Sequence, residues 1–330
     1  MTENFKVSIC MITYNHEAYI AQAIEGVLMQ KTDFDFQLII GDDCSTDHTR
    51  NICLDYKKKY PDKIILRLPE KNLGCEQNFV KNLETCANGF KYTAICEGDD
   101  YWIDASKLQK QVDVLQSNEN LGLVYTDSKI FNQQTLTFEN KISKFFEEKN
   151  ELITEILKTN YIEFASVLFR NKVLSELLQR VLLDDFKGNT VLDTRIILEF
   201  AQKSTIAYLP ILTTVYRRAI GSVSRPTNID RFIAVTKEAY QLRRDFVKKY
   251  NYKTNLLAIP ICNYNRLLIF KAFGTNNYFV VLKLLSNVKF FDLFLFADFV
   301  TLRNKFGFKT ILKIALSAIG IRALFLSIRK

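Results

Sequence analysis

Apolar segments of strand type alternate with segments of helical periodicity from residue 7 to residue 127. The strand-type segments are 7–12, 36–40, 64–68, 92–96 and 121–127, and the helical ones are 18–30, 45–60, 76–87 and 108–115. Apolar residues spaced three and four apart indicate helices, whereas short apolar runs bounded by turn residues indicate buried strands. This alternation is typical of βαβ units, so it predicts an α/β fold with a mostly parallel sheet covered by helices on both faces.

Polar side chains directly follow three of the predicted strands. These clusters are Thr13-Tyr14-Asn15, Asp42-Asp43 and Glu97-Gly98-Asp99-Asp100. The carboxyl ends of parallel strands meet at one edge of a sheet, and ligands of open α/β sheets bind beyond that edge. We therefore expect the three clusters to share one crevice.

The third cluster has the spacing of a cation site. Carboxylates two residues apart, such as Glu97 and Asp99, can converge on one ion, and their hard oxygen atoms suit Mg²⁺ or Mn²⁺. Such a cation would neutralise a diphosphate leaving group as its bond breaks. A solvated acidic turn is the alternative, and the position at the sheet edge favours the cation site.

The second cluster suits a different task. The carboxylate of Asp42 can accept a ring N–H of uracil, thymine or guanine and thereby select a base. Tyr14 offers a flat ring on which a base can stack. Ser45 and Asp47 are residue types that cap helices, so a turn followed by a capped helix explains the same segment, and both interpretations can hold together.

The basic excess of the chain lies in its last quarter. Residues 252–330 contain 12 Lys and Arg against two Asp, a net charge of +10, whereas the whole chain carries +9 and the first 251 residues therefore carry −1. We expect two domains, residues 1–226 and a helical, basic C-terminal extension over residues 227–330. Burial of its apolar side chains against the catalytic body or in a homo-oligomer, and binding to an anionic membrane surface, both explain this extension.

Several other classes of protein are disfavoured. Seven cysteines without a C-x-x-C pair argue against a zinc ribbon or a disulfide framework and fit a reducing compartment. The start of the chain does not resemble a secretory signal, and the uncharged stretches near the end are far shorter than the ~18–20 residues of a membrane crossing. No recognised nucleic-acid-binding module is visible. The expectation is a cytoplasmic protein, with peripheral binding to the inner face of the plasma membrane as an extension of it.

Five blocks of sequence, taken in order, resemble the family 2 glycosyltransferases of the GT-A fold. They are Ile12-Thr13-Tyr14-Asn15-His16-Glu17, Ile40-Gly41-Asp42-Asp43-Cys44-Ser45-Thr46-Asp47, Asn72-Leu73-Gly74, Glu97-Gly98-Asp99-Asp100-Tyr101-Trp102 and Lys107-Leu108 with Gln111. The likeness covers residues 5–225 and implies a GT-A, Rossmann-like sheet. It also implies transfer of a sugar from a nucleotide-diphosphate donor to an acceptor hydroxyl, usually with inversion and with bound Mn²⁺ or Mg²⁺.

The resemblance implies roles for individual residues as well. The residues assigned to the nucleotide are Thr13, Tyr14, Asn15, Glu17, Asp42, Glu97 and Gly98. Asp99, supported by Asp100, is assigned to the metal. Trp102, Arg217 and Arg218 are assigned to the donor phosphates or the acceptor.

Asp193 is the expected general base. Family members carry an aspartate at the head of a helix in the second half, before an apolar helix and a Tyr-Arg strand, and Asp193 precedes Ile196–Phe200 and Tyr216-Arg217 in the same way. An N-cap role for Asp193 is the alternative. Asp184 and Asp185 lie close by in the sequence and are further acidic residues of this region.

Three positions depart from the family pattern. Glu97 stands where aspartate is frequent, Gln77 where arginine is common, and Ala219 near the place where many relatives have histidine. A non-catalytic nucleotide-sugar binding module with the same fold is therefore the alternative to an enzyme. A phosphorylation-dependent receiver domain, which also gathers aspartates at a sheet edge, is about one third of this length and does not explain the chain.

The predicted function is that of a metal-dependent, inverting glycosyltransferase. It would move one sugar, with UDP as the expected nucleotide, to a hydroxyl of a glycan or lipid-linked acceptor. The resemblance suggests bacterial capsule, lipopolysaccharide or exopolysaccharide synthesis. No Q-x-x-R-W segment like that of processive synthases is found, which favours addition of a single sugar.

Overall fold

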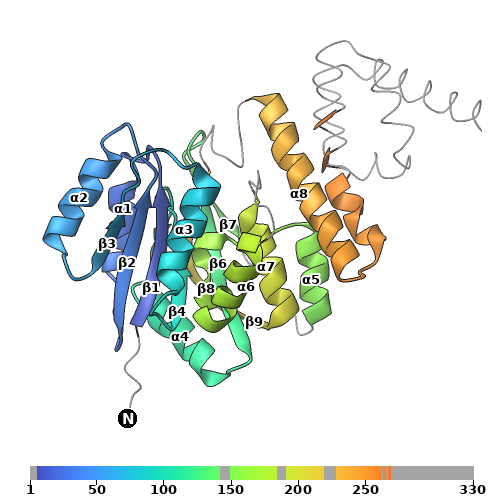
Figure 1. Cartoon of the computed structure of the whole chain (residues 1–330), viewed down its shortest axis with the longest axis horizontal. Coiled ribbons are helices and arrows are strands. Elements are labelled where there is room, and N and C mark those ends of the chain that lie inside the picture. Colours follow the sequence, from blue (N-terminus) through green and yellow to red (C-terminus); the bar gives the residue numbers. More distant parts are fainter. Residues whose placement is uncertain are drawn as a thin grey trace, which may run out of the picture. The chain divides into compact units, whose positions relative to one another are not determined.

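A computed structural model describes residues 6–141, 149–183, 191–218, 228–261, 263–264 and 267–268 (Figure 1). The chain divides into two compact units, residues 1–225 and 226–330. Residues 269–330, which hold most of the basic tail, lie outside the described residues. The expected membrane or subunit contacts of that tail therefore stay predictions.

The first unit alternates strands and helices along most of its length. In chain order its elements are β1 (Lys6–Thr13), α1 (Ile20–Leu28), β2 (Asp35–Asp42), α2 (Thr49–Lys59), β3 (Ile64–Arg67), α3 (Cys75–Ala87), β4 (Tyr92–Ile95), β5 (Tyr101–Trp102), α4 (Lys107–Ser117), β6 (Leu121–Asn132), β7 (Thr137–Lys141), α5 (Lys149–Lys158), the 3₁₀ turn η1 (Phe164–Ser166), β8 (Leu168–Arg170), α6 (Asn171–Leu183), α7 (Leu192–Lys203) and β9 (Thr205–Arg218). The alternation predicted up to residue 127 is confirmed to within a few residues at the element ends.

The described strands form one sheet of nine, in the order β3-β2-β1-β4-β8-β6-β9-β5, with β7 paired to β6. Only the part built by β1 to β4 is uniformly parallel. Strand β8 runs antiparallel to both β4 and β6, β5 runs antiparallel to β9, and β7 antiparallel to β6, whereas β6 and β9 are parallel. The prediction of a mostly parallel sheet is confirmed, because the parallel pairings of β1 to β4 and of β6 with β9 include most of the paired residues, while β8 enters between β4 and β6 in the reverse direction and adds short antiparallel pairings.

Helices cover both faces of the sheet, and the alternation of side chains along β1 shows how. Val7, Ile9 and Met11 belong to the core cluster that includes the buried residues of α1. Ser8 and Cys10 point to the other face, where the Ser8 hydroxyl donates to the carbonyl of Cys86 in α3 and Asn82 of α3 donates to the Cys10 sulfur. Side chains of successive strand residues point to opposite faces, so β1 is buried on both sides and reads as a continuous apolar run.

The second unit contains α8 (Ile229–Lys249) and the 3₁₀ turn η2 (Thr254–Leu257). Helix α8 is the first described element of the helical extension expected from residue 227. Asn228 caps it, since its side-chain oxygen accepts the N–H groups of Asp230 and Arg231 at 2.8 and 3.2 Å. Of the helices in the described ranges, none combines the length and the apolar run needed to cross a bilayer.

Trp102 and Lys107 pack together in the core beneath the acidic turn, which is the segment Glu97-Gly98-Asp99-Asp100. The Trp102 side chain is only 2% exposed, and its indole N–H donates to the carbonyl of Ala165 at 3.0 Å. Helix α1 reaches it because residue 26 is glycine: a Cβ there would lie 2.9 Å from the Trp102 backbone. The Lys107 amine lies 4.2 Å from the Trp102 ring and donates to Gln111 Oε1 at 2.6 Å. Trp102 is thus a core residue, in contrast to the ligand contact expected from the sequence.

Burial lowers the pKa of Lys107 to about 7, although the nearby Cys96 and Asp104 oppose the shift. Between that pKa and the ordinary value of 10.5, the unfolded chain binds more protons than the folded protein, so the free energy of unfolding rises with pH in this window. The side chain is fully buried and has no outlet to water. Lys107 is therefore a source of pH-dependent stability in the core.

Replacing Lys107 with methionine removes this titration and keeps a side chain of similar volume. From about pH 7 to about pH 9 we expect the unfolding free energy of the wild type to gain about 2 kcal/mol relative to Lys107→Met. Urea unfolding of both proteins at several pH values measures the difference. Parallel stability curves for the two proteins would show that the Lys107 amine stays protonated in the folded state.

Candidate functional site

The strand register brings the three polar clusters to one edge of the sheet. Thr13 at the end of β1 lies opposite Asp42 at the end of β2. The turn after β4 joins them, since the Gly98 N–H donates to the carbonyl of Ile12 at 2.9 Å. Residue 98 must be small, because a Cβ there would lie 2.8 Å from the Thr13 side chain. Thr13, Asp42 and Gly98 thus come together as the sequence predicts.

The loops that follow β1 and β2 are bonded to each other. Asn15 Oδ1 accepts the Thr46 N–H at 2.8 Å, and Glu17 Oε2 accepts the His48 N–H at 2.9 Å. These contacts hold the second loop out of helical geometry, so α2 begins at Thr49 and not at the predicted residue 45. Asn15 and Glu17 therefore act as ties between the loops, and they leave the Tyr14 ring 43% exposed.

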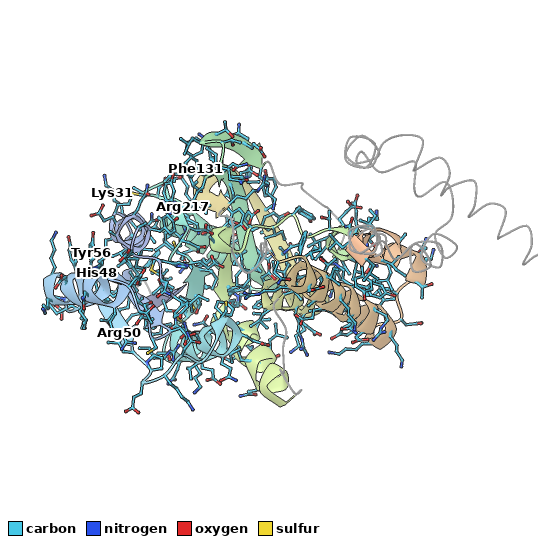
Figure 2. All side chains as sticks on the ribbon, turned by 90° about the horizontal axis from the view of Figure 1, so that it is seen from above. Lys31, His48, Arg50, Tyr56, Phe131 and Arg217 are labelled. Atoms are coloured by element: carbon cyan, nitrogen blue, oxygen red, sulfur yellow. The ribbon has the colours of Figure 1, made fainter. Side chains whose placement is uncertain are left out.

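Asp42 is bound within the protein. Its side chain is 0% exposed, its Oδ2 accepts from Arg50 Nε at 2.7 Å and its Oδ1 accepts the Ser45 N–H at 3.3 Å. Arg50 comes from α2 (Figure 2). Its neighbour Asp43 accepts the N–H of Gly74 at 2.9 Å and so fixes the next loop along the edge. Asp42 lies at the predicted edge, but its carboxylate binds Arg50 of α2 and the Ser45 N–H in the loop before that helix.

Glu97 lies in a strongly negative environment. Burial, together with the negative charges of Asp99, Asp193 and Glu163, raises its pKa to about 8. Its Oε2 is buried and has no hydrogen-bond partner within the described residues. Carboxylates from separate segments therefore lie close enough to act on Glu97.

Asp99 and Asp100 have different surroundings, although both were assigned to a metal. The Asp99 side chain is 26% exposed, and its Oδ2 lies 4.0 Å from His16 Nε2. Asp100 is buried, and its Oδ1 accepts the backbone N–H of Arg217 at 2.8 Å. Burial raises the pKa of Asp100 well above its usual range, and the charges of Asp99 and Glu97 add to the shift. Asp99 is the member of the pair that faces solvent.

The two arginines assigned to phosphate or acceptor are both engaged within the protein. Arg217 is 6% exposed and donates through Nη1 to the carbonyl of Asp99 at 2.6 Å. Arg218 Nη1 lies 3.6 Å from Glu139 Oε2 on β7. Ala219, near the place where many relatives have histidine, lies outside the described residues.

Asp193 lies in the first turn of α7. The N-cap of that helix is Val191, so Asp193 is inside the helix and does not cap it. Its Oδ2 accepts from Asn160 Nδ2 at 3.3 Å, and its charge raises the pKa of Glu97, which brings it within electrostatic reach of the acidic turn. Asp184 and Asp185 lie outside the described residues.

Glu163 is the site residue that the sequence did not indicate. It precedes η1, forms an ion pair with Lys141 and contributes to the raised pKa values of Glu97 and Asp100. The only sequence signal was an acidic residue within an apolar stretch, Ile162-Glu163-Phe164, and no spacing connected it to the acidic turn.

A divalent cation fits this edge only as a partly protein-bound ion. In the part of the chain that the structure describes, no three His, Cys, Asp or Glu side chains are placed to hold a metal by themselves. Mg²⁺ and Mn²⁺ in nucleotide sites are commonly bound by one or two carboxylates together with phosphate oxygens and water. The exposed carboxylate of Asp99, next to the unpartnered Oε2 of Glu97, fits that pattern.

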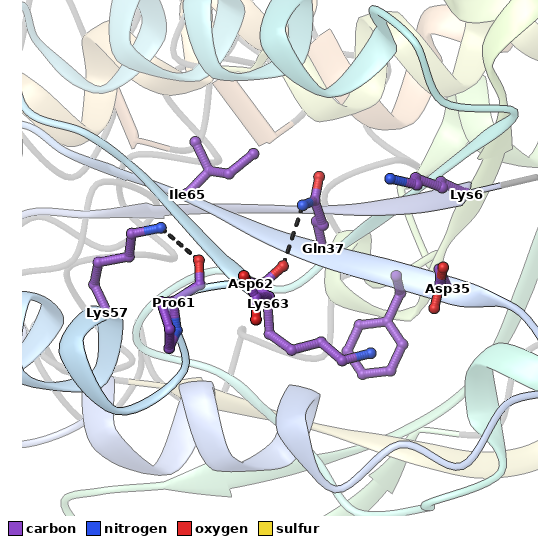
Figure 3. Close-up of a pocket in the computed structure, with 9 residues that line it drawn as sticks. Lys6, Asp35, Gln37, Lys57, Pro61, Asp62, Lys63 and Ile65 are labelled. Carbon is purple, nitrogen blue, oxygen red and sulfur yellow. Dashed lines mark hydrogen bonds between the residues drawn. The ribbon is translucent and has the colours of Figure 1, made fainter.

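A pocket at the opposite edge of the sheet involves none of these residues. It is lined by Lys6, Asp35, Phe36, Gln37, Lys57, Pro61, Asp62, Lys63 and Ile65 (Figure 3). Lys57 Nζ donates to the carbonyls of Pro61 and Ile64 at 2.7 and 2.6 Å. The pocket is formed where β1 and β2 begin, so it is separate from the site at their carboxyl ends.

Several known proteins are similar to this chain in sequence or structure. Residues 8–178 match the family described as glycosyl transferase family 2. An uncharacterized protein of Mycobacterium tuberculosis is 31% identical over 226 residues, which are 68% of this chain and 62% of that protein. The Escherichia coli UDP-Glc:alpha-D-GlcNAc-diphosphoundecaprenol beta-1,3-glucosyltransferase WfgD is 27% identical over 173 residues, 52% of this chain and 63% of that enzyme. The chain thus spans somewhat less than two thirds of the length of these relatives.

A solved structure shows the same fold at low sequence identity. The mannosyltransferase PcManGT of Pyrobaculum calidifontis, in complex with GDP-Man and Mn²⁺, superposes with a TM-score of 0.54 at 14% identity, over 96% of this chain and 86% of that one. The fold is therefore that of the GT-A glycosyltransferases, as the sequence predicts.

The buried pair of Asp42 and Arg50 leads to a test of its structural role. Replacing Arg50 with glutamine leaves the Asp42 carboxylate buried without its cation, and we expect a loss of about 3 kcal/mol in the free energy of unfolding. The double variant Asp42→Asn/Arg50→Gln should lose clearly less than the sum of the two single losses, because it also removes the buried charge.

Urea unfolding of the four proteins in this cycle gives the coupling energy. Lys58→Gln is the matched control on the same helix, since Lys58 forms an exposed pair with Asp55. Its loss should stay below about 0.5 kcal/mol. Additive losses for Asp42→Asn and Arg50→Gln would contradict the structural role of the pair.

Proposed function

This chain belongs to glycosyl transferase family 2, and we propose that it transfers one sugar from a nucleotide-diphosphate donor to an acceptor hydroxyl. The observation that supports this function best is the grouping of carboxylates at the carboxyl edge of the sheet, where Asp99 and Asp193 raise the pKa of Glu97 and the buried Oε2 of Glu97 has no hydrogen-bond partner within the described residues. Clustered carboxylates suit a site that receives a cation and a base-catalysed reaction.

The donor is proposed to bind with its base on Tyr14, whose exposed ring offers a stacking surface. Thr13, Gly98 and Glu97 line the adjacent edge and are proposed to face the ribose. Asp42 would act on the base through the loop that it anchors. UDP is the proposed nucleotide, and the name of the relative WfgD gives UDP-Glc as the donor of that enzyme.

Asp99 is proposed to hold a Mn²⁺ or Mg²⁺ ion, with Asp100 fixing the turn that carries it. When bound, such an ion supplies positive charge to the diphosphate leaving group. PcManGT, which shares the fold, was solved with Mn²⁺. The pairing of Asp100 with the Arg217 N–H keeps the direction of the turn constant.

Asp193 is proposed to be the general base of an inverting transfer. The acceptor oxygen would attack the anomeric carbon from the face opposite the diphosphate while its proton passes to a carboxylate oxygen of Asp193, and the bond to the diphosphate would break. Asn160 would orient the base through its contact with Asp193 Oδ2. The configuration at the anomeric carbon is then inverted.

The acceptor is proposed to be a glycan or a lipid-linked saccharide in the synthesis of a bacterial surface polysaccharide. The name of WfgD places the acceptor of that enzyme on diphosphoundecaprenol, a lipid carrier. An acceptor of this kind lies at a membrane surface, to which the excess of Lys and Arg in residues 252–330 would be attracted.

A non-catalytic nucleotide-sugar binding module remains the second candidate. Gln77 and Ala219, at positions where relatives often carry an arginine and a histidine, favour it. The two functions differ in turnover: an enzyme releases UDP from UDP-sugars with Mn²⁺ present, whereas a binding module is stabilised by the same donors without releasing UDP.

The role of Asp193 can be tested against its acidic neighbour. We expect Asp193→Asn to lower kcat for UDP release by about 10²- to 10⁴-fold, because the amide cannot accept the proton of the acceptor hydroxyl. The dissociation constant for UDP with Mn²⁺ should not change. The matched variant Glu163→Gln, which removes a nearby carboxylate paired with Lys141, should reduce kcat less than tenfold. Equal losses in both variants would exclude Asp193 as the specific base.

The assignment of Asp99 predicts loss of metal-dependent donor binding. With UDP and Mn²⁺ at about 100 times their dissociation constant, the wild type should gain about 2.7 kcal/mol in unfolding free energy. We expect Asp99→Asn to keep its stability without ligands but to lose the part of this gain that depends on Mn²⁺. Thermal shift with UDP, GDP and ADP, each with and without Mn²⁺, measures it. Equal gains in wild type and variant would exclude Asp99 as the ligand.

A further inference from the structure

The side chain of Arg217 connects three segments at the edge of the site. It comes from the end of β9, and its Nη1 donates to the carbonyl of Asp99 at 2.6 Å. Its Nη2 donates to Gln22 Oε1 on α1. Its own backbone N–H donates to Asp100 Oδ1 at 2.8 Å, so β9 holds both aspartates of the turn through two independent contacts.

Both aromatic neighbours of Arg217 further restrict its guanidinium. The guanidinium carbon lies 4.5 Å from the centre of the Tyr101 ring and 5.1 Å from that of Tyr19. A guanidinium over an aromatic face is attracted by the ring quadrupole. Arg217 is therefore fixed in orientation as well as in position, and it is nearly inaccessible to solvent at 6% exposure.

This arrangement is unsuited to binding a diphosphate directly. An arginine binds phosphate by presenting the paired N–H groups of its planar fork to the oxygen atoms. In Arg217 one N–H of each terminal nitrogen is used, for the Asp99 carbonyl and for Gln22, and the side chain is nearly inaccessible to solvent. The same commitments place a positive charge directly beneath a turn that carries the carboxylates of Glu97, Asp99 and Asp100.

We propose that Arg217 is a positioning residue that clamps the Asp99 backbone and thereby sets the direction of the Asp99 carboxylate toward the cation. This inference rests on the proposed function, because it presupposes that Asp99 holds a divalent ion. The planar fork is required, since it serves the Asp99 carbonyl and Gln22 at the same time. A lysine keeps the charge but has a single nitrogen and lacks the fork geometry.

Arg170 provides a matched control elsewhere in the fold. Its Nε donates to the carbonyl of Leu121 at 2.8 Å, its Nη2 donates to the carbonyl of Asn118 at 3.3 Å, and its guanidinium carbon lies 5.4 Å from the centre of the Tyr92 ring. Arg170 is thus also an arginine that binds carbonyl oxygens beside an aromatic ring. It pairs with Tyr92 where β4 begins, at the end of that strand remote from the acidic turn.

The experiment compares Arg217→Lys and Arg217→Gln with Arg170→Lys and Arg170→Gln in the full chain. Two constants are measured: the apparent Kd of Mn²⁺ at saturating UDP, and the Kd of UDP in EDTA. Both Arg217 variants should weaken Mn²⁺ by at least about tenfold, as loss of an outer-shell partner does, and should leave UDP binding in EDTA within about twofold. The Arg170 variants should lower the melting temperature without changing the Kd of Mn²⁺.

A milder variant keeps the test valid if the Arg217 variants do not fold. Gln22→Ala removes one partner of the guanidinium from an exposed position on α1 and should weaken Mn²⁺ severalfold. The sole tryptophan, Trp102, follows directly after Tyr101, so its fluorescence reports whether the turn is still folded.

Three results would overturn the inference. An unchanged Kd of Mn²⁺ in the Arg217 and Gln22 variants would show that the clamp does not set the cation site. Weaker UDP binding in EDTA with unchanged Mn²⁺ would make Arg217 a phosphate ligand. A wild-type protein that binds UDP without any effect of Mn²⁺ would remove the cation from the proposed function itself, a result that is distinct from the first two because it appears before any substitution.

Discussion

Mutual repulsion among carboxylates at the carboxyl edge of the sheet is the constraint on which the site depends. The parallel register of β1, β2 and β4 brings Asp42, Glu97 and their neighbours to one edge, whatever their charges. Negative charges in a buried setting are costly unless a cation or a proton compensates them. The raised pKa of Glu97, caused by burial and by Asp99, shows that this cost is only partly compensated without ligands. The grouped carboxylates therefore lower the stability of the fold and at the same time favour the binding of a positive charge.

Two acidic residues of this edge are fixed by partners within the protein. The carboxylate of Asp42 accepts from Arg50, and that of Asp100 accepts from the backbone N–H of Arg217, so both are buried and held in place. Within the described residues, the carboxylate of Asp99 has no partner closer than His16 at 4.0 Å, and it remains partly exposed to solvent. The division between internally bonded and solvent-facing carboxylates therefore separates the residues that shape the edge from those available to a donor, a cation or an acceptor.

The strands and helices that could be predicted from the sequence are those whose burial produces a clear pattern of apolar residues. Strands β1, β2 and β4 have helices on both sides and appear as apolar runs, and α1 and α4 show helical spacing of their apolar residues. Strands β5 and β8 have two and three residues, too few for any period to be visible, and β8 is the strand that makes the sheet mixed. Site positions followed from motif order, because a motif fixes where a residue lies along the edge. The roles of Asn15, Asp42, Trp102 and Arg217 did not follow, because a role depends on which distant partner the fold supplies.

Arg217 illustrates why that partner decides the chemistry. In the sequence it is a basic residue in a basic dipeptide that the resemblance assigns to donor phosphates or the acceptor, and its charge alone favours such a contact. In the fold, β9 carries it against Asp99, Gln22 and two tyrosine rings, which hold its guanidinium and leave it 6% exposed. Its charge still acts on the site, but through the backbone of the acidic turn. A motif residue such as Arg217 can thus affect the binding of a ligand without contacting it. Its substitution is expected to change the geometry of the exposed carboxylate of Asp99.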